Sequence, residues 1–242
     1  EESAMGCILK IHIKTLSNLF IGGAPKSFEI GGIDQWTAAD EDGFPCIPAS
    51  SLKGALRAIV SRDTSEKAAE IAEWYREYLR REKESVCARV LSLDKQKKEG
   101  MERFERRYDS AIENASASYL FGIREFNDTP KLFFNDLRVT DRNQEPKKYF
   151  SIDAKTAIDS NGLEPKSNPR TYKAVKTGVE FEGAIEFYGF AEDENFIETS
   201  KAYIMDNLEK FNSGIYRLGN SKSRGYGRIS VTFPDWDGGR TE

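Results

Sequence analysis

Apolar residues recur along this chain at two different spacings, and the spacing separates the expected strands from the expected helices. Segments in which apolar positions alternate predict β-strands, because successive strand side chains point to opposite faces. Four such segments lie at residues 7–15, 131–139, 179–190 and 228–233. Apolar residues three and four apart predict helices instead, as at residues 50–61 and 195–211.

The order of these elements is strand, helix, strand, strand, helix, strand. This is the split βαβ pattern of the ferredoxin-like fold. We therefore expect an α+β fold with a ferredoxin-like (RRM-like) core, in a single domain that spans residues 1–242. Such a fold hosts many functions, so the function has to be argued from particular residues.

Two segments fall outside this core. Residues 64–117 are rich in charge and helical in pattern, with few helix breakers before Gly100, which predicts a helical insertion. Acids and bases are mixed along it, so we expect a poor surface for phosphate groups and an element that contacts other proteins. Residues 147–176 contain Pro165 and Pro169 among several polar residues and predict a long, thumb-like hairpin.

Composition narrows the class of protein. The chain has 242 residues and is 38% apolar, which is enough to bury a sizeable core. No stretch approaches the roughly 18 apolar residues of a membrane span, and the N-terminus lacks a signal-peptide pattern, so we expect a cytoplasmic protein with no membrane partner. The three cysteines lie far apart and His12 is the single histidine, which predicts no metal site in the isolated chain.

The net charge of −4 argues mildly against a nucleic-acid-binding protein, but the distribution of charge argues for one. Residues 47–62 hold three basic side chains and no acid, and residues 214–231 hold four basic side chains and no acid. Basic segments can also face an acidic protein surface, so charge alone leaves both partners open.

The first basic segment contains the sequence IPASSLKGALR at residues 47–57. Ser50 and Ser51 can cap a helix whose free N–H groups attract a phosphate. Lys53 and Arg57 are four residues apart and share one helix face, while Gly54 allows another backbone to approach closely. The alternative interpretation is an ordinary capped amphipathic helix.

The second basic segment contains the sequence GNSKSRGYGR at residues 219–228. Its three glycines predict a loop that exposes several backbone N–H groups, and Lys222, Arg224 and Arg228 add positive charge for phosphates. Tyr226 could stack on a base. The loop matches neither a Walker A motif nor GxGxxG, so we expect no nucleotide cofactor, and the alternative is a flexible surface turn.

The third motif is a carboxylate beside two glycines, IGGID at residues 30–34. Asp34 could approach a substrate or another backbone closely, although an aspartate in a turn is the simpler interpretation. A single histidine excludes a ribonuclease that uses a histidine pair as acid and base.

Taken together, these motifs resemble the RAMP superfamily, and in particular the repeated backbone subunit of type III, Csm-type CRISPR effector complexes. The matching segments follow the family's order: LFIGG at residues 19–23, EIGGID at 29–34, IPASSLKGALR at 47–57, YLFG at 119–122, NPRTYKAV at 168–175 and GNSKSRGYGR at 219–228. Ala49 replaces the usual glycine before the two serines, and the long helical insertion is a larger departure from the family.

The resemblance implies a function in which copies of the chain line up along a guide RNA (crRNA), beside other CRISPR effector subunits and a target RNA. In catalytic members, the aspartate at the position of Asp34 supports target RNA cleavage that depends on Mg²⁺ or a similar divalent cation, held partly by the RNA. The RNA-binding residues implied here are Ser50, Ser51, Lys53, Gly54, Arg57, Arg170, Lys222, Ser223, Arg224, Gly225, Tyr226 and Arg228.

Two alternatives remain open at this point. A structural RAMP subunit would bind RNA through the same motifs without cutting it, and only Asp34 separates it from a cleaving subunit. A stand-alone endonuclease that processes guide RNA is a third class, and the scarcity of histidines counts against it.

Overall fold

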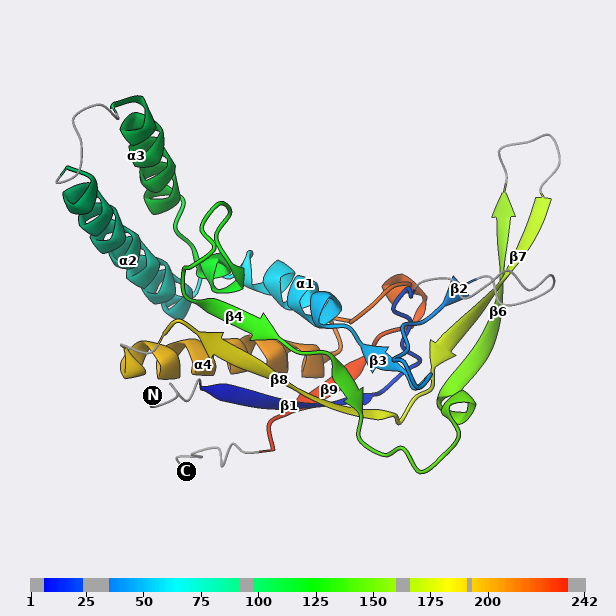
Figure 1. The fold of residues 1–242 in the computed structure, drawn as a ribbon. Helices are drawn as coiled ribbons and strands as arrows, with labels where there is room; N and C mark the ends of the chain where they lie inside the picture. Colours follow the sequence, from blue (N-terminus) through cyan, green and yellow to red (C-terminus); the bar gives the residue numbers. More distant parts are fainter. Residues whose placement is uncertain (1–6, 24–34, 92–97, 160–165, 191–192, 235–242) are drawn as a thin grey trace. The chain divides into compact units, whose positions relative to one another are not determined.

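The computed structural model describes residues 7–23, 35–91, 98–159, 166–190 and 193–234 (Figure 1). Contacts group the chain into two compact units, each built from several segments. The first, here called the helical unit, comprises Glu1–Cys7, Arg57–Phe133 and Phe187–Ile204. The second, the sheet unit, comprises Ile8–Leu56, Phe134–Glu186 and Met205–Glu242. The expected insertion falls within the helical unit and the expected thumb within the sheet unit.

The main sheet confirms the predicted ferredoxin-like topology. Its central path has the order β3-β5-β8-β1-β9, with antiparallel pairing throughout. The strands are β1 (Ile8–Thr15), β3 (Cys46–Ile47), β5 (Leu137–Val139), β8 (Glu180–Tyr188) and β9 (Ile229–Thr232). The long helices of the core are α1 (Ala49–Val60) and α4 (Glu194–Glu209), which follow the first and third core strands as the split βαβ pattern requires.

The predicted strand at residues 131–139 is divided into β4 (Lys131–Phe134), which also pairs with β8, and β5. Asn135 and Asp136 separate the two, and both residue types are poor strand formers. Asp136 also turns its carboxylate to the start of α1, where the Ala49 amide donates a hydrogen bond to it over 2.7 Å.

Buried and accessible side chains alternate along β1, so one face of this strand lies in the core of the sheet unit. Leu9, Ile11, Ile13 and Thr15 are buried, while the residues between them are more accessible. The buried Thr15 hydroxyl donates to the Lys176 carbonyl over 2.8 Å and accepts a hydrogen bond from the Val179 amide over 2.9 Å. The polar side chain at the end of β1 therefore has both a donor and an acceptor partner inside the core.

The thumb-like segment is a long two-stranded arm, seen in Figure 1 as the pair β6 and β7. β6 (Phe150–Asp159) and β7 (Lys166–Val175) pair over ten residues each, and β2 (Gln35–Trp36) adds a short parallel strand to β7. A bridge between Leu19 and Val175 ties the base of the arm to the segment that follows β1. Short 3₁₀ turns complete the sheet unit at Pro146–Tyr149, Lys210–Ser213 and Lys222–Arg224.

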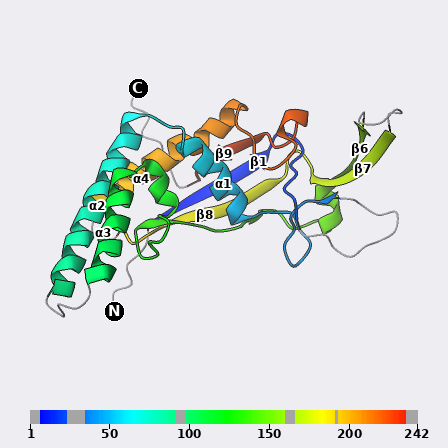
Figure 2. The same ribbon diagram turned by 90° about the horizontal axis from the view of Figure 1, so that it is seen from above.

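The helical unit contains the expected insertion as two helices that lie side by side (Figures 1 and 2). They are α2 (Glu66–Leu91) and α3 (Lys98–Glu113), followed by a 3₁₀ turn at Ala117–Phe121. Trp74 stacks on Phe196 with ring centroids 3.8 Å apart, and the buried Tyr75 hydroxyl donates to the Pro130 carbonyl. In the part of the chain that the structure describes, no helix combines the length and apolar character needed to cross a bilayer.

Candidate nucleic-acid interface

The glycine-rich loop at residues 219–228 is held in a defined shape by its backbone. Gly219, Gly225 and Gly227 all have positive φ angles, of 79°, 94° and 79°, a region that other residues rarely adopt. At Gly227 a side chain would also collide with the Leu218 carbonyl oxygen, and at Gly219 with that of Phe20. The fold itself therefore requires glycine at these positions.

The loop is fastened to the segment that follows β1. The Asn220 amide donates to the Phe20 carbonyl over 2.7 Å, and the Gly227 amide donates to the Asn18 carbonyl over 2.9 Å. The Arg228 amide donates to the Ser17 hydroxyl over 3.0 Å. The alternative of a flexible surface turn therefore does not fit this hydrogen-bonded arrangement.

The basic side chains of the loop stand on its outer surface. Lys222, Ser223 and Arg224 form a single 3₁₀ turn and all three are exposed. Gly225 is exposed too, and a side chain added there would meet no atom of the described residues within 4 Å. A hollow of about 570 Å³ beside the turn is lined by Arg217, Lys222 and Ser223 together with Gly214, Ile215 and Gly225.

Arg228 is exposed at the end of the loop, and its guanidinium lies against Gly214. Arg217, which sequence reasoning did not single out, donates from Nη1 to the Lys222 carbonyl over 3.0 Å. The hydrogen-bonded backbone therefore holds several cations together on the outer surface of the loop. Such an arrangement is suited to binding the phosphates of a nucleic-acid strand.

Tyr226 is placed differently from the sequence interpretation. Its side chain is only 6% exposed and packs in a cluster with Phe20, Tyr172 and Ala174, so its ring offers no open face to a base. Its hydroxyl donates a hydrogen bond to the Asp153 carboxylate on β6. Burial, and after it this hydrogen bond, raise the pKa of Tyr226 well above its ordinary value, so the hydroxyl stays protonated as a donor.

The Asp153 carboxylate collects a second donor, the side-chain amide of Asn18, over 3.1 Å. Asn18 also donates to the Ser151 hydroxyl over 3.0 Å. Tyr226 and Asn18 thus tie the glycine-rich loop and the end of β1 to the base of the arm. No sequence signal pointed to Asp153 or Asn18, because the contact joins residues far apart along the chain.

The start of α1 presents the other expected contacts. α1 begins at Ala49, so Ser50 and Ser51 lie inside its first turn instead of capping it, and the Asp136 carboxylate accepts the hydrogen bond of the Ala49 amide. Ser50 is exposed, and Ser51 and Lys53 are partly exposed. Gly54 is exposed, and no atom of the described part of the chain lies within 4 Å of a side chain added there. Arg57, one turn further along α1, is exposed and is grouped with the helical unit.

Of the remaining expected residues, Arg170 is exposed on β7 opposite Lys155 of β6. Asp34 lies outside the described residues, and the described chain resumes at Gln35, the first residue of β2. Within the described ranges, no group of three or more histidine, cysteine, aspartate or glutamate side chains could hold a metal ion.

The fold and this surface define a class of α+β protein in which a ferredoxin-like core carries a rigid basic loop and a hairpin arm. A family model described as the RAMP superfamily matches residues 12–230, and the chain belongs to this superfamily. The CRISPR system Cms endoribonuclease Csm3 of Streptococcus thermophilus is 27% identical over 219 residues, which make up 90% of this chain and 83% of that protein.

A solved structure supports the fold. A chain of the type III-B Cmr-beta complex bound to cognate target RNA, determined by cryo-EM, matches 93% of this chain with a TM-score of 0.52 at 17% identity. The present chain spans 58% of that chain's length. A chain of the apo Cmr-beta complex gives a TM-score of 0.48 at 12% identity, over 94% of this chain and 97% of that one.

We predict that Tyr226→Phe lowers the free energy of unfolding by about 1–2 kcal/mol, because a hydrogen bond to a half-buried carboxylate is lost. Urea denaturation of the variant and the parent measures the difference. Tyr216→Phe, which removes the hydroxyl of a 38% exposed tyrosine, is the matched control and should leave stability unchanged. Equal losses in the two variants would contradict the anchoring role of Tyr226.

Proposed function

We propose that this chain is a guide-RNA-binding backbone subunit of a type III CRISPR effector complex and that it also cleaves target RNA. The observation that carries the binding part is the exposed Lys222–Arg224 turn, held rigid on its glycine frame in a member of the RAMP superfamily. Backbone phosphates are the sequence-independent feature of a guide strand, and cations with exposed amides recognise them.

Gly54, near the start of α1, supports the same function because the packing of the chain does not explain a glycine there. A glycine inside a helix costs about 1 kcal/mol relative to alanine, and among the described residues Gly54 has no close neighbour that would require its small size. The open surface above it suits the close approach of an RNA backbone, with Ser50, Ser51 and Lys53 beside it.

The cleaving part of the proposal rests on Asp34 and on the name of the Streptococcus thermophilus relative, which is an endoribonuclease. Asp34 would orient or deprotonate the 2′-hydroxyl that attacks the neighbouring phosphate. A bound Mg²⁺ would offset negative charge on that phosphate. Since the described residues form no cluster of metal ligands, RNA phosphates would supply ligands beside Asp34.

In this proposal, the partners are the guide RNA, the target RNA, other effector subunits and further copies of the chain, in the cytoplasm. The arm would reach the guide–target duplex, with Arg170 exposed on its β7 strand. A subunit that binds RNA without cutting it remains the second candidate, and it shares every contact except the role of Asp34.

We predict that Lys53→Glu combined with Arg224→Glu weakens guide-RNA binding and makes the remaining binding less dependent on salt. Each phosphate contact releases counterions when the RNA binds. The loss of two contacts should therefore make the slope of log affinity against log salt shallower by about 1.4 for a single strand. Fluorescence anisotropy across a salt series measures this slope. Arg80→Glu with Arg81→Glu, on exposed positions of α2, is the control of equal charge change, and an identical loss there would sink the assignment.

We predict that Gly54→Ala raises the free energy of unfolding by about 1 kcal/mol and yet lowers guide-RNA affinity by on the order of tenfold. The methyl group improves the helix and obstructs the approaching backbone. Ala58→Gly, at an exposed position of the same helix, should lower stability and leave affinity unchanged. Unaltered affinity in Gly54→Ala would exclude close contact of RNA at this surface.

We predict that assembled complex carrying Asp34→Ala binds target RNA normally and does not cleave it in the presence of Mg²⁺. Binding depends on cations and amides, whereas cutting depends on the lost carboxylate. A labelled target on a denaturing gel, run beside a binding measurement, tests both, with Asp42→Ala as a control that should still cut. Cleavage by Asp34→Ala at the parent rate would refute the catalytic role, and a parent complex that never cuts would favour the non-cleaving subunit.

A further inference from the structure

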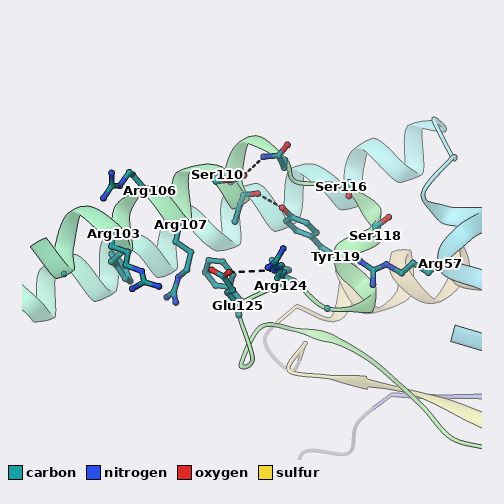
Figure 3. A pocket seen from close by; sticks show the side chains of 17 residues that line it. Arg57, Arg103, Arg106, Arg107, Ser110, Ser116, Ser118, Tyr119, Arg124 and Glu125 are labelled. Atoms are coloured by element: carbon teal, nitrogen blue, oxygen red, sulfur yellow. Dashed lines mark hydrogen bonds and ion pairs between the residues drawn. The ribbon is translucent and has the colours of Figure 1, made fainter. Parts of the chain in front are cut away.

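A pocket of about 1030 Å³ lies within the helical unit and is lined by an unusual number of arginines (Figure 3). The five are Arg57, Arg103, Arg106, Arg107 and Arg124. Among the lining residues that the structure describes, Glu125 is the single acid, so five positive charges face one negative charge there. Figure 3 shows Arg103 and Arg107 extending from α3 toward the side on which Arg124 and Glu125 lie.

Helix geometry explains why mixed charges in the sequence become separated in space. On α3, Arg103, Arg107 and Ser110 share one side of the helix at spacings of four and three residues. The acids follow their own stripe at Glu102, Glu105, Asp109 and Glu113. The expectation of a poor phosphate surface, drawn from the alternation of acids and bases, therefore does not fit the folded insertion.

The two stripes of α3 have different environments. Asp109 forms an ion pair of 2.6 Å with Lys83 on α2, so the acidic side is partly engaged within the unit. On the basic side, no carboxylate pairs with Arg57, Arg103, Arg106 or Arg107 among the residues that the structure describes. The one acid that lines the pocket, Glu125, lies 3.8 Å from the 94% exposed Arg124.

Several arginines are held in place rather than left free to disperse. The Arg107 guanidinium lies 4.9 Å from the Phe126 ring centroid and 5.9 Å from that of Phe104, and Arg106 donates from Nε to the Glu102 carbonyl. Packing like charges around one hollow costs free energy in the absence of a counter-charge. The arrangement is thus suited to a ligand that supplies several negative charges together.

We propose that this arginine pocket binds the phosphate backbone of a single-stranded RNA, as a second RNA contact beyond the loop and α1 surface. Guanidinium forks match phosphate oxygens in a bidentate manner. Hydroxyl groups of Ser110, Ser116 and Ser118 also line the pocket and can bond to phosphate or sugar oxygens.

Aromatic side chains favour RNA over an acidic protein segment as the occupant. Phe104 and Tyr119 line the pocket and are partly exposed, so they offer ring surface to unstacked bases beside the cations. Tyr119 is fixed in position because its hydroxyl donates to the Ala111 carbonyl over 2.8 Å. Arg57 joins the pocket from α1, one helical turn after Lys53, a residue expected to contact RNA.

The test measures binding of fluorescein-labelled oligouridine to the full chain across a salt series. Arg103→Gln with Arg107→Gln removes two pocket cations and keeps good helix formers. We expect about tenfold weaker binding at low salt and a salt slope shallower by about 1.4. The control of equal charge change is Arg76→Gln with Arg80→Gln on α2, which should bind like the parent.

Ultraviolet cross-linking of the same RNA, followed by peptide mapping, locates the contact. We expect cross-links at Phe104 or Tyr119 that are lost in the pocket variant and kept in the α2 control. Equal binding by the pocket variant and the parent, or equal losses in pocket variant and control, would overturn the proposal. So would unchanged RNA binding combined with weaker self-association, which would assign the pocket to an acidic protein surface.

A parallel measurement on Lys53→Glu with Arg224→Glu separates this inference from the proposed function. If that variant binds RNA more weakly and the pocket variant binds it like the parent, only the proposal for the arginine pocket is wrong. If the pocket variant binds RNA more weakly and the other variant does not, the arginine pocket is supported as an RNA contact. The assignment of the loop and α1 surface is then wrong. When both contribute independently, the losses in binding free energy add in the combined variant.

Discussion

The packing of the loop at residues 219–228 against the segment that follows β1 is the constraint on which the candidate interface depends. Gly219 and Gly227 sit so close to neighbouring carbonyl groups that no side chain fits, and their positive φ angles turn the chain back on itself. The backbone amides of Asn220 and Gly227 make the hydrogen bonds of this packing. The basic side chains of Lys222 and Arg224 remain exposed on the outer surface of the loop. The buried Tyr226 then extends the same constraint to the arm through Asp153.

Charge in this protein is arranged by position more than by amount. The net charge is −4, yet the glycine-rich loop, the start of α1 and the arginine pocket each gather positive charge within their own unit. A polyanion is repelled by the chain as a whole and attracted at these places, so local fields select where it binds. Salt dependence, rather than affinity at one salt concentration, is the physical signature of such contacts.

Membership of the RAMP superfamily and the likeness to Csm3 place this chain among CRISPR-related proteins, while the physical argument for the proposed function rests on the described side chains. Binding and cleavage have different requirements. Binding needs a fixed frame and several weak, additive contacts, which we propose that the loop and α1 provide. Cleavage needs one carboxylate placed beside a reacting 2′-hydroxyl, and in the proposed function Asp34 would be the residue that separates a cleaving subunit from a structural one.

The sequence by itself determined the order of core strands and helices, because periodicity of two or near four reports which face of each element is buried. It also determined that Lys222 and Arg224 share a glycine-rich turn and that helices lie within residues 64–117, where the structure has α2 and α3, since both are local properties. Tertiary structure alone decided that Tyr226 is an anchor and not a stacking platform, because its partner Asp153 lies on another strand. It also decided that arginines from α1, α3 and the following loop line one pocket, since helix packing brings together residues that no local pattern links.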